Sequence, residues 1–201
     1  PARGESQATA CGDAIAGLLQ RHGWSLAPVI DASVLLRAWQ TASLIAERLR
    51  DLGLGAPCVE AFEALTERGL GIAGNLSLQQ IAAVVEQDPR IAPLPHDWKA
   101  DSRFRLPLPG AESLLDAGRR VAAHLLERFP VTPSDRPVLK LFVGHGAAFR
   151  HAAYHLGALK SDELSRLSMH HAEPVVFQVR DGAWTRIAGH WKRRPGDDAP
   201  D

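Results

Sequence analysis

Apolar positions recur at helical spacing through much of the chain. Between residues 8 and 19 they share one helical face, and His22-Gly23 follows as a C-terminal stop. A second helical pattern starts near Leu36 and ends before Gly53. The same spacing predicts further helices at residues 78–85, 112–129, 146–156 and 161–167.

Short apolar or alternating stretches between these patterns predict β-strands. They are residues 28–33, 57–59, 138–143, 174–179 and 183–187. Asp181-Gly182 predicts a hairpin turn between the last two. Because strands alternate with helices before the hairpin, the pattern predicts an α/β fold with a mostly parallel sheet, helices on both faces and a closing C-terminal antiparallel hairpin.

The domain organisation follows from length and local composition. Residues 1–191 are expected to form a single domain, since a chain of 201 residues with 45% hydrophobic positions can bury one substantial core. Residues 72–110 are proline-bearing and polar, which predicts an insertion over one sheet edge and a candidate lid. The charged tail 192–201 is expected to be disordered.

Charge and cysteine content exclude several classes of protein. Lys plus Arg equals Asp plus Glu at 23 each, so no global basic excess favours nucleic acid or an anionic membrane. Cys11 and Cys58 stand far apart, without zinc-site spacing or the density of a disulfide scaffold. No apolar run reaches the roughly 20 residues that span a bilayer. A cytoplasmic location is expected.

The segment 138–157 carries the clearest chemical signal. Its apolar strand ends in Gly144-His145-Gly146, and a helix follows at once. The two glycines permit a sharp turn that sets the imidazole at a strand end, beside the open amides of a helix N-terminus. Such an edge of an α/β sheet favours an anionic ligand. The alternative is that His145 is a turn residue bonded to its neighbours.

Other polar residues are expected at the same edge of the sheet. Arg37 follows one predicted strand, and Glu67 and Arg68 follow the next. Arginine binds phosphate with paired, charge-assisted hydrogen bonds, and a nearby carboxyl group can protonate a leaving oxygen. The set therefore suits phosphoryl transfer. Each member also has a structural alternative, with Arg37 capping a helix and Glu67 and Arg68 forming a solvated pair.

Four other histidines are candidate ligands. His151 and His155 have the i, i+4 spacing of some zinc sites, but no glutamate follows His151, so a solvated or hydrogen-bonded pair is the favoured interpretation. His170-His171 precede the hairpin and are candidates for contact with substrate.

Several stretches together resemble motifs of the histidine phosphatase superfamily, also called phosphoglycerate mutase-like. Residues 33–42 are similar to its Ser-x-Leu-x-Arg-Ala-x-x-Thr signature, and 65–71 to its Leu-x-Glu-Arg-x-x-Gly loop. Residues 110–113 are close to its Gly-Glu-Ser segment with one residue inserted, and 144–150 resemble its second histidine motif. The motifs occur in the family's order, which makes the signal specific.

The resemblance implies a three-layer α/β/α sandwich and a covalent phosphohistidine mechanism. It assigns phosphate binding to Arg37, Arg68, His145 and Gly146, proton transfer to Glu67, and stabilisation of the transferring group to a charged His145. Cationic side chains neutralise the phosphoryl oxygens, so no metal or other cofactor is implied. The expected partner is a small phosphorylated substrate, and a homodimer is one assembly that the sequence allows.

The chain departs from the family's pattern at the nucleophile. In the family this histidine follows the first strand in an Arg-His-Gly motif, and the expectation is that nothing in this chain supplies it. Residues 2–5 could be a decayed copy, but residues 1–8 look more like the family's later Leu-Thr-x-x-Gly-x-x-Gln-Ala helix start. The expectation is that the first strand and the nucleophile lie upstream of Pro1.

Three functions follow as hypotheses. The first is a phosphatase that hydrolyses a small phosphorylated metabolite. The second is a phosphoglycerate mutase-type transferase, which differs in whether water or a bound hydroxyl accepts the phosphoryl group. The third is an inactive member that binds phosphorylated ligands or a protein partner; the missing nucleophile favours it, and the retained Arg37, Glu67 and His145 oppose it.

Overall fold

The computed structural model describes residues 2–129 and 136–194. Its centre is a parallel sheet of order β2-β1-β3, formed by β1 (Ser25–Ser33), β2 (Cys58–Phe62) and β3 (Val138–Val143). All three strands therefore end at one edge. The first strand begins at Ser25, earlier than the sequence predicts, and passes through Pro28, which cannot donate to the ladder. Its register with β3 shifts between Leu26 and Ile30, which accommodates the proline.

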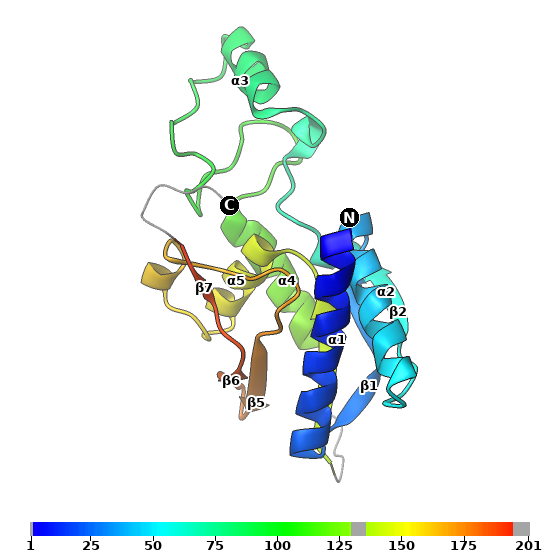
Figure 1. The fold of residues 1–201 in the computed structure, drawn as a ribbon. Coiled ribbons are helices and arrows are strands. Elements are labelled where there is room, and N and C mark those ends of the chain that lie inside the picture. Colours follow the sequence, from blue (N-terminus) through cyan, green and yellow to red (C-terminus); the bar gives the residue numbers. More distant parts are fainter. Residues whose placement is uncertain (1, 130–135, 195–201) are drawn as a thin grey trace.

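Helices cover both faces of this sheet (Figure 1). On one face lie α1 (Ala2–His22) and α2 (Leu36–Asp51), which pack on the apolar side chains of β1 and on alternate residues of β3, namely Leu139, Leu141 and Val143. On the other lie α4 (Leu114–Arg128) and α5 (Gly146–His155), which pack on Phe62 and Phe142. Because successive side chains of a strand point to opposite faces, β3 contributes side chains to both helix layers. The predicted three-layer α/β/α sandwich is confirmed.

The helices α4 and α5 approach each other closely. A Cβ atom on Gly118 would lie 2.6 Å from the backbone carbon of His151. Glycine at this position therefore lets the two helices pack backbone to backbone. The N-terminus of α4 is fixed by a capping box, in which the Ser113 hydroxyl accepts from the Asp116 amide and the Asp116 carboxylate accepts from the Ser113 amide.

Residues 72–110 leave the sandwich after the short turn η1 (Glu63–Leu65) and contain η2 (Gly71–Ala73) and α3 (Leu78–Gln87). They extend beyond the sheet edge (Figure 1) and hold their own apolar cluster around Ile81, Trp98 and Leu106. An antiparallel bridge between Leu70 and Ala111 closes the base. The helix predicted at 78–85 is confirmed; a lid role for this insertion stays a prediction.

The C-terminal part departs from the predictions in detail. The predicted hairpin is present as β5 (Val176–Arg180) and β6 (Ala183–Ala188), but in the described chain it forms a separate two-stranded sheet and does not extend the parallel one. The helix predicted at 161–167 shortens to η3 (Ser161–Glu163), because Leu167–Ser168 form strand β4.

The tail prediction is wrong at its start. Lys192 and Arg193 form strand β7, which pairs antiparallel with β4. These backbone hydrogen bonds order both residues despite their charge. Residues 195–201 of the predicted tail, and residues 130–135 of the linker before β3, lie outside the described residues. The structure contains no helix long and apolar enough to cross a bilayer in the ranges it describes.

Candidate active site

The predicted site residues meet at the carboxyl edge of the parallel sheet. His145 follows β3, serves as the N-cap residue of α5 and is only 5% exposed. A Cβ on Gly144 would lie 2.4 Å from the Phe149 ring, so glycine is required for this tight strand-to-helix turn. The turn brings the two ring nitrogens of His145 to residues that follow or end β1.

Both ring nitrogens of His145 are engaged. Nδ1 lies 3.0 Å from Nη2 of Arg37, and Nε2 lies 3.0 Å from Oγ of Ser33. A guanidinium can only donate, so Nδ1 accepts and Nε2 carries the proton that it donates to Ser33. The Ser33 hydroxyl oxygen also accepts from the Leu35 amide, at 3.2 Å. Arg37 thus fixes the tautomer of the imidazole, and Ser33 accepts the proton on Nε2.

The environment of His145 disfavours its protonation. Burial, and then the positive charges of Arg37 and Arg120, lower the pKa of His145 to about 4. The imidazole is therefore neutral near pH 7 in this structure. This differs from the charged donor that the resemblance implies.

Glu67 is the carboxylate of the site. Its Oε2 lies 3.9 Å from Nδ1 of His145, and its side chain is 39% exposed. The Arg68 amide donates to its Oε1 at 3.2 Å. Arg37, Glu67 and His145, which end or follow different strands, are therefore brought together as predicted. Their position lets Glu67 reach solvent and the edge of the sheet at the same time.

Arg68 is placed differently. Its guanidinium carbon lies 5.4 Å from the ring centroid of Trp98, in the insertion. It is not among the residues that line the cavity next to His145. Trp98 gave no signal in the sequence, because its contact with Arg68 depends on how the insertion folds back. Phosphate binding by Arg68 stays a prediction, which requires its side chain to turn toward Arg37.

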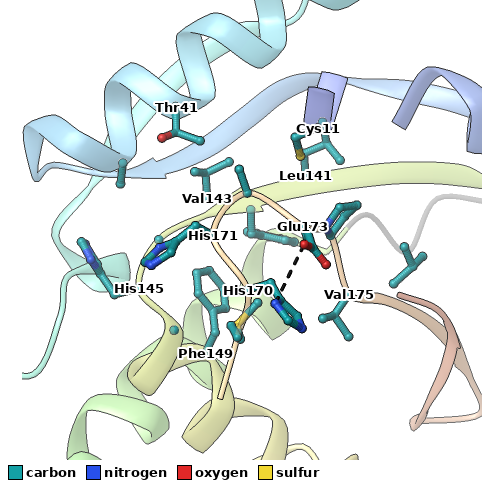
Figure 2. Close-up of a pocket in the computed structure, with 18 of the residues that line it drawn as sticks. Cys11, Thr41, Leu141, Val143, His145, Phe149, His170, His171, Glu173 and Val175 are labelled. Atoms are coloured by element: carbon teal, nitrogen blue, oxygen red, sulfur yellow. Dashed lines mark ion pairs between the residues drawn. The ribbon is translucent and has the colours of Figure 1, made fainter. Parts of the chain in front are cut away.

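A cavity of about 1160 Å³ opens beside His145 (Figure 2). Arg37, Glu67, His145 and Gly146 line one end of it. It continues along β3 to β5, so the edge of β3 not paired to β1 and the edge of β5 not paired to β6 border the same space. His170 and His171 also line it, and His170 Nδ1 lies 3.9 Å from Glu173 Oε1.

The expectation that the chain lacks the motif is wrong for the tripeptide itself, since Arg-His-Gly occurs at residues 21–23, where the pattern predicts only a helix stop. His22 is the last residue of α1 and stacks on Trp24, with ring centroids 4.3 Å apart. It precedes β1, whereas Ser33 and His145 lie at the carboxyl edge, about 25 Å away along the strand. His22 therefore cannot serve as a nucleophile at this site.

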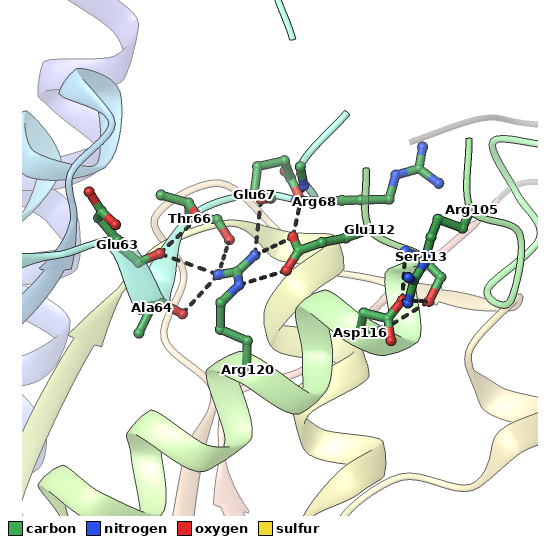
Figure 3. A network of polar contacts seen from close by, with 11 residues as sticks. Glu63, Ala64, Thr66, Glu67, Arg68, Arg105, Glu112, Ser113, Asp116 and Arg120 are labelled. Carbon is green, nitrogen blue, oxygen red and sulfur yellow. Dashed lines mark hydrogen bonds and ion pairs between the residues drawn. The ribbon is translucent and has the colours of Figure 1, made fainter. Parts of the chain in front are cut away.

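A polar network supports the loop that carries Glu67 (Figure 3). Arg120, on α4, donates to backbone carbonyl oxygens of residues 63–67 and to both carboxylate oxygens of Glu112. Glu112 belongs to a recognised motif, but Arg120 was not predicted. Arg120 lies in the second turn of α4, and no local pattern marks its contact with the loop.

His151 and His155 are hydrogen-bonded, the alternative favoured from the sequence. His151 donates from Nδ1 to the Ala147 carbonyl at 2.7 Å, and its Nε2 accepts from the Ser102 hydroxyl at 2.9 Å. His155 Nε2 donates to the Leu115 carbonyl at 2.9 Å. Among residues 2–129 and 136–194, no group of three or more His, Cys, Asp or Glu could hold a metal ion.

Comparison with known proteins places these residues in context. Residues 1–189 match the histidine phosphatase superfamily (branch 1). This chain is 30% identical over 150 residues to the 2,3-bisphosphoglycerate-dependent phosphoglycerate mutase of Chelativorans sp. (strain BNC1). It is 27% identical over 149 residues to the enzyme of the same name from Sinorhizobium fredii (strain NBRC 101917 / NGR234). These matches cover 73% and 74% of this chain but 66% and 65% of the relatives. The chain thus spans slightly less than two thirds of their length.

Solved structures show the same fold. The mycobacterial glucosyl-3-phosphoglycerate phosphatase Rv2419c aligns with a TM-score of 0.56 at 22% identity, covering 94% of this chain and 83% of that one. Bacillus stearothermophilus YhfR aligns with a TM-score of 0.59 at 18% identity, covering 90% and 78%.

Proposed function

Because the chain belongs to the histidine phosphatase superfamily, we propose that it is a phosphatase that hydrolyses a small phosphorylated metabolite by a phosphohistidine-type mechanism. One observation carries the proposal: Arg37, Glu67 and His145 converge at the carboxyl edge of the sheet, at 3.0 and 3.9 Å from the His145 Nδ1 atom. A guanidinium, an imidazole and a carboxylate around one point are the groups that phosphoryl transfer needs.

Substrate binding begins with the exchange of partners at His145. The Arg37 guanidinium releases Nδ1 and donates to two phosphoryl oxygens, and the N-terminal amides of α5, starting at Gly146, donate to the same group. The two negative charges of a phosphate monoester then favour protonation of His145. The imidazole becomes a second donor, as the resemblance implies, only when the anion is present. Arg68 turns from Trp98 to complete the phosphate site.

Glu67 handles the protons in this proposal. As the nucleophilic histidine nitrogen bonds to phosphorus and the P–O bond to the leaving group breaks, the Glu67 carboxyl group donates a proton to the departing oxygen. In the second half, the Glu67 carboxylate takes a proton from the water that attacks the phosphohistidine, the P–N bond breaks, and inorganic phosphate leaves. The half-exposed position of Glu67 suits both steps, because both the leaving group and water reach the site from solvent.

The nucleophile is proposed to be a histidine on a further strand beside β3. The cavity supports this, since it lies between edges of β3 and β5 that pair with no strand among residues 2–129 and 136–194, and it is also lined by His145. An extended segment there would pair with both edges and bury their free backbone groups. Its carboxyl end would lie beside His145.

Mutase activity is the second candidate. The named relatives that are phosphoglycerate mutases favour it. Phosphatase and mutase share the first half-reaction and differ in whether water or a bound hydroxyl accepts the phosphoryl group. An inactive binding protein is the third, and the convergence at His145 argues against it.

The test is a phosphatase assay on the natural gene product with p-nitrophenyl phosphate, followed by an alkaline denaturing quench and analysis for acid-labile phosphohistidine. Turnover with a trapped phosphohistidine supports the proposal. Absence of both turnover and trapped phosphate, in protein that still binds phosphate, would establish the binding function in its place. Transfer to 3-phosphoglycerate in competition with water separates mutase from phosphatase.

A further inference from the structure

Arg120 lies beneath the loop that carries Glu67 and contacts its backbone repeatedly. Nη1 donates to the carbonyl oxygens of Glu63, Ala64 and Thr66 at 3.3, 2.9 and 3.2 Å, and Nη2 donates to the carbonyl oxygen of Glu67 at 3.3 Å. A guanidinium has five N–H donors in a rigid plane, so it can satisfy several carbonyls of one loop at once. Lysine could not reproduce this fork.

Glu112 holds both Arg120 and the far side of the same loop. Its carboxylate accepts from Nε and Nη2 of Arg120 at 2.9 and 2.7 Å, and its Oε2 accepts from the Gly69 amide at 2.9 Å. The Glu112 amide in turn donates to the Gly69 carbonyl at 2.8 Å. Arg120 and Glu112 therefore fix the backbone on both sides of the dipeptide Glu67-Arg68.

The ion pair between Arg120 and Glu112 is largely buried. The side chains of Arg120 and Glu112 are 25% and 26% exposed. Burial alone would raise the pKa of Glu112, but the hydrogen bonds from Arg120 and from the Gly69 amide outweigh it and lower that pKa. Glu112 is therefore a carboxylate at neutral pH, and the pair stays charged and bidentate.

We propose that Arg120 and Glu112 are positioning residues, which set the Glu67 carboxyl against His145 without contacting the substrate. This inference rests on the proposed function, since it gives the pair a purpose only if Glu67 transfers a proton. Proton transfer depends on the placement of the donor, so a loop held at five carbonyls and one amide is a means of preorganisation.

Leaving-group dependence distinguishes positioning from general support of the fold. Glu67→Gln should lose activity mainly toward alkyl phosphates, whose leaving oxygen needs a proton, and less toward p-nitrophenyl phosphate. Arg120→Lys keeps the charge but not the fork, so it should reproduce that selectivity, with about tenfold lower kcat/KM for alkyl phosphate and under about threefold for the aryl ester. Glu112→Gln is the second variant, should Arg120→Lys fold poorly.

A double variant tests whether the pair acts through Glu67. In a Glu67→Gln background, Arg120→Lys should add less than about twofold to the loss, because the carboxyl it positions is already gone. Arg105→Met is the matched control: Arg105 is also an arginine paired with an acidic residue at α4, Asp116, with a contact of 2.6 Å. It should leave both substrates within about twofold of wild type.

A measurement independent of activity separates this inference from the proposed function. The amide of Gly69 should exchange its hydrogen at least about tenfold faster in Glu112→Gln, while the amide of Ile45 in α2 stays unchanged. Unchanged exchange at Gly69, or equal losses on alkyl and aryl phosphates in Arg120→Lys, would overturn the positioning role. Faster exchange at Gly69 in Glu112→Gln, together with a wild-type protein that hydrolyses neither phosphate, would uphold the clamp on the loop and reject the phosphatase.

Discussion

Nη2 of Arg37 lies 3.0 Å from Nδ1 of His145, so two groups proposed to hold a phosphoryl group hold each other in this structure. The contact requires a neutral imidazole, and the Ser33 hydroxyl completes it by accepting from Nε2 at 3.0 Å. An incoming anion must separate the pair and replace one hydrogen bond by several. Anion binding is therefore linked to proton uptake by His145 and to the positions of the Arg37 and His145 side chains.

His145→Ala and Arg37→Ala should each lower turnover of the natural enzyme by at least about two orders of magnitude, because each removes a donor aimed at the transferring group. Steady-state kinetics beside circular dichroism checks both. Arg90→Ala is the control, since Arg90 is 86% exposed and pairs with Asp88 in the insertion. Near wild-type turnover in a correctly folded His145→Ala protein would reject the site.

Stability should fall as pH is lowered through the window set by His145. Its pKa is about 4 in the folded protein and 6.5 when unperturbed. Above pH 6.5 both states are neutral and His145 has no effect; below it the unfolded chain takes up the proton more readily, and the native state is penalised down to about pH 4. Urea unfolding of wild type against His145→Gln measures this, and His145→Gln should show a shallower decline.

Sulfate binding should have the opposite pH dependence, because an anion raises the pKa of His145. Sulfate keeps its two charges across this range, so tighter binding between about pH 7.5 and 5.5 reports proton uptake by the protein. NMR titration of the imidazole signals provides the measurement. His170 and His171 also line the cavity, so each is replaced by glutamine in turn. A pH dependence that survives in His145→Gln would assign the proton elsewhere.

Ser33→Ala should lower kcat by about tenfold with little change in folding, because it removes the hydroxyl that accepts from Nε2 and orients the His145 ring. The hydroxyl is buried and also accepts from the Leu35 amide. The ¹⁵N shift of Nε2 should move, because this nitrogen loses its hydrogen-bond acceptor. Ser33→Thr, which keeps the hydroxyl, should restore the wild-type shifts; unaltered shifts in Ser33→Ala would contradict the assignment.

Asp31→Asn should destabilise the protein by about 3–5 kcal/mol, the cost of leaving buried charges without their partner. Asp31 is fully buried and accepts from His124, Arg128 and Lys140. Burial alone would raise the pKa of Asp31, but hydrogen bonds from Arg128 and Lys140 outweigh it and lower that pKa. Urea unfolding measures the change. Asp13→Asn is the control: its pair with Arg48 is half exposed, and its loss should cost under about 1 kcal/mol.

The sequence predicted most of the sandwich because its local patterns agree with the fold. Parallel strands end at one edge, so residues that follow them meet, and Arg37, Glu67 and His145 could be found together without coordinates. Strand limits were harder. Pro28 suggested a strand start, whereas β1 continues through it by a register shift. Lys192 and Arg193 looked like a disordered tail because their partners in β4 lie far away in the sequence.

The residues that support the site could not be predicted from the sequence for the same reason, which is that their partners lie far away in the chain. Arg120 contacts a loop more than 50 residues earlier, and Trp98 reaches Arg68 only after the insertion folds back. The neutral state of His145 depends on burial and on the charges of Arg37 and Arg120, which no local pattern encodes. Such properties arise from contacts between distant segments.

The structure at the base of the insertion allows residues 72–110 to be replaced as a unit. Leu70 bridges Ala111, the Ile72 amide donates to the Pro109 carbonyl, and Gly71, with φ of +61°, lets the two passes of the chain touch. The chain therefore leaves and re-enters the sandwich at adjacent points, and the entropy of closing the segment between them grows only slowly with its length. Insertions of other sizes or sequences can be grafted at this junction while the register of Glu67 and Glu112 is kept. The segment can therefore diverge in evolution, or be exchanged by design, without rebuilding the edge of the sheet that holds His145.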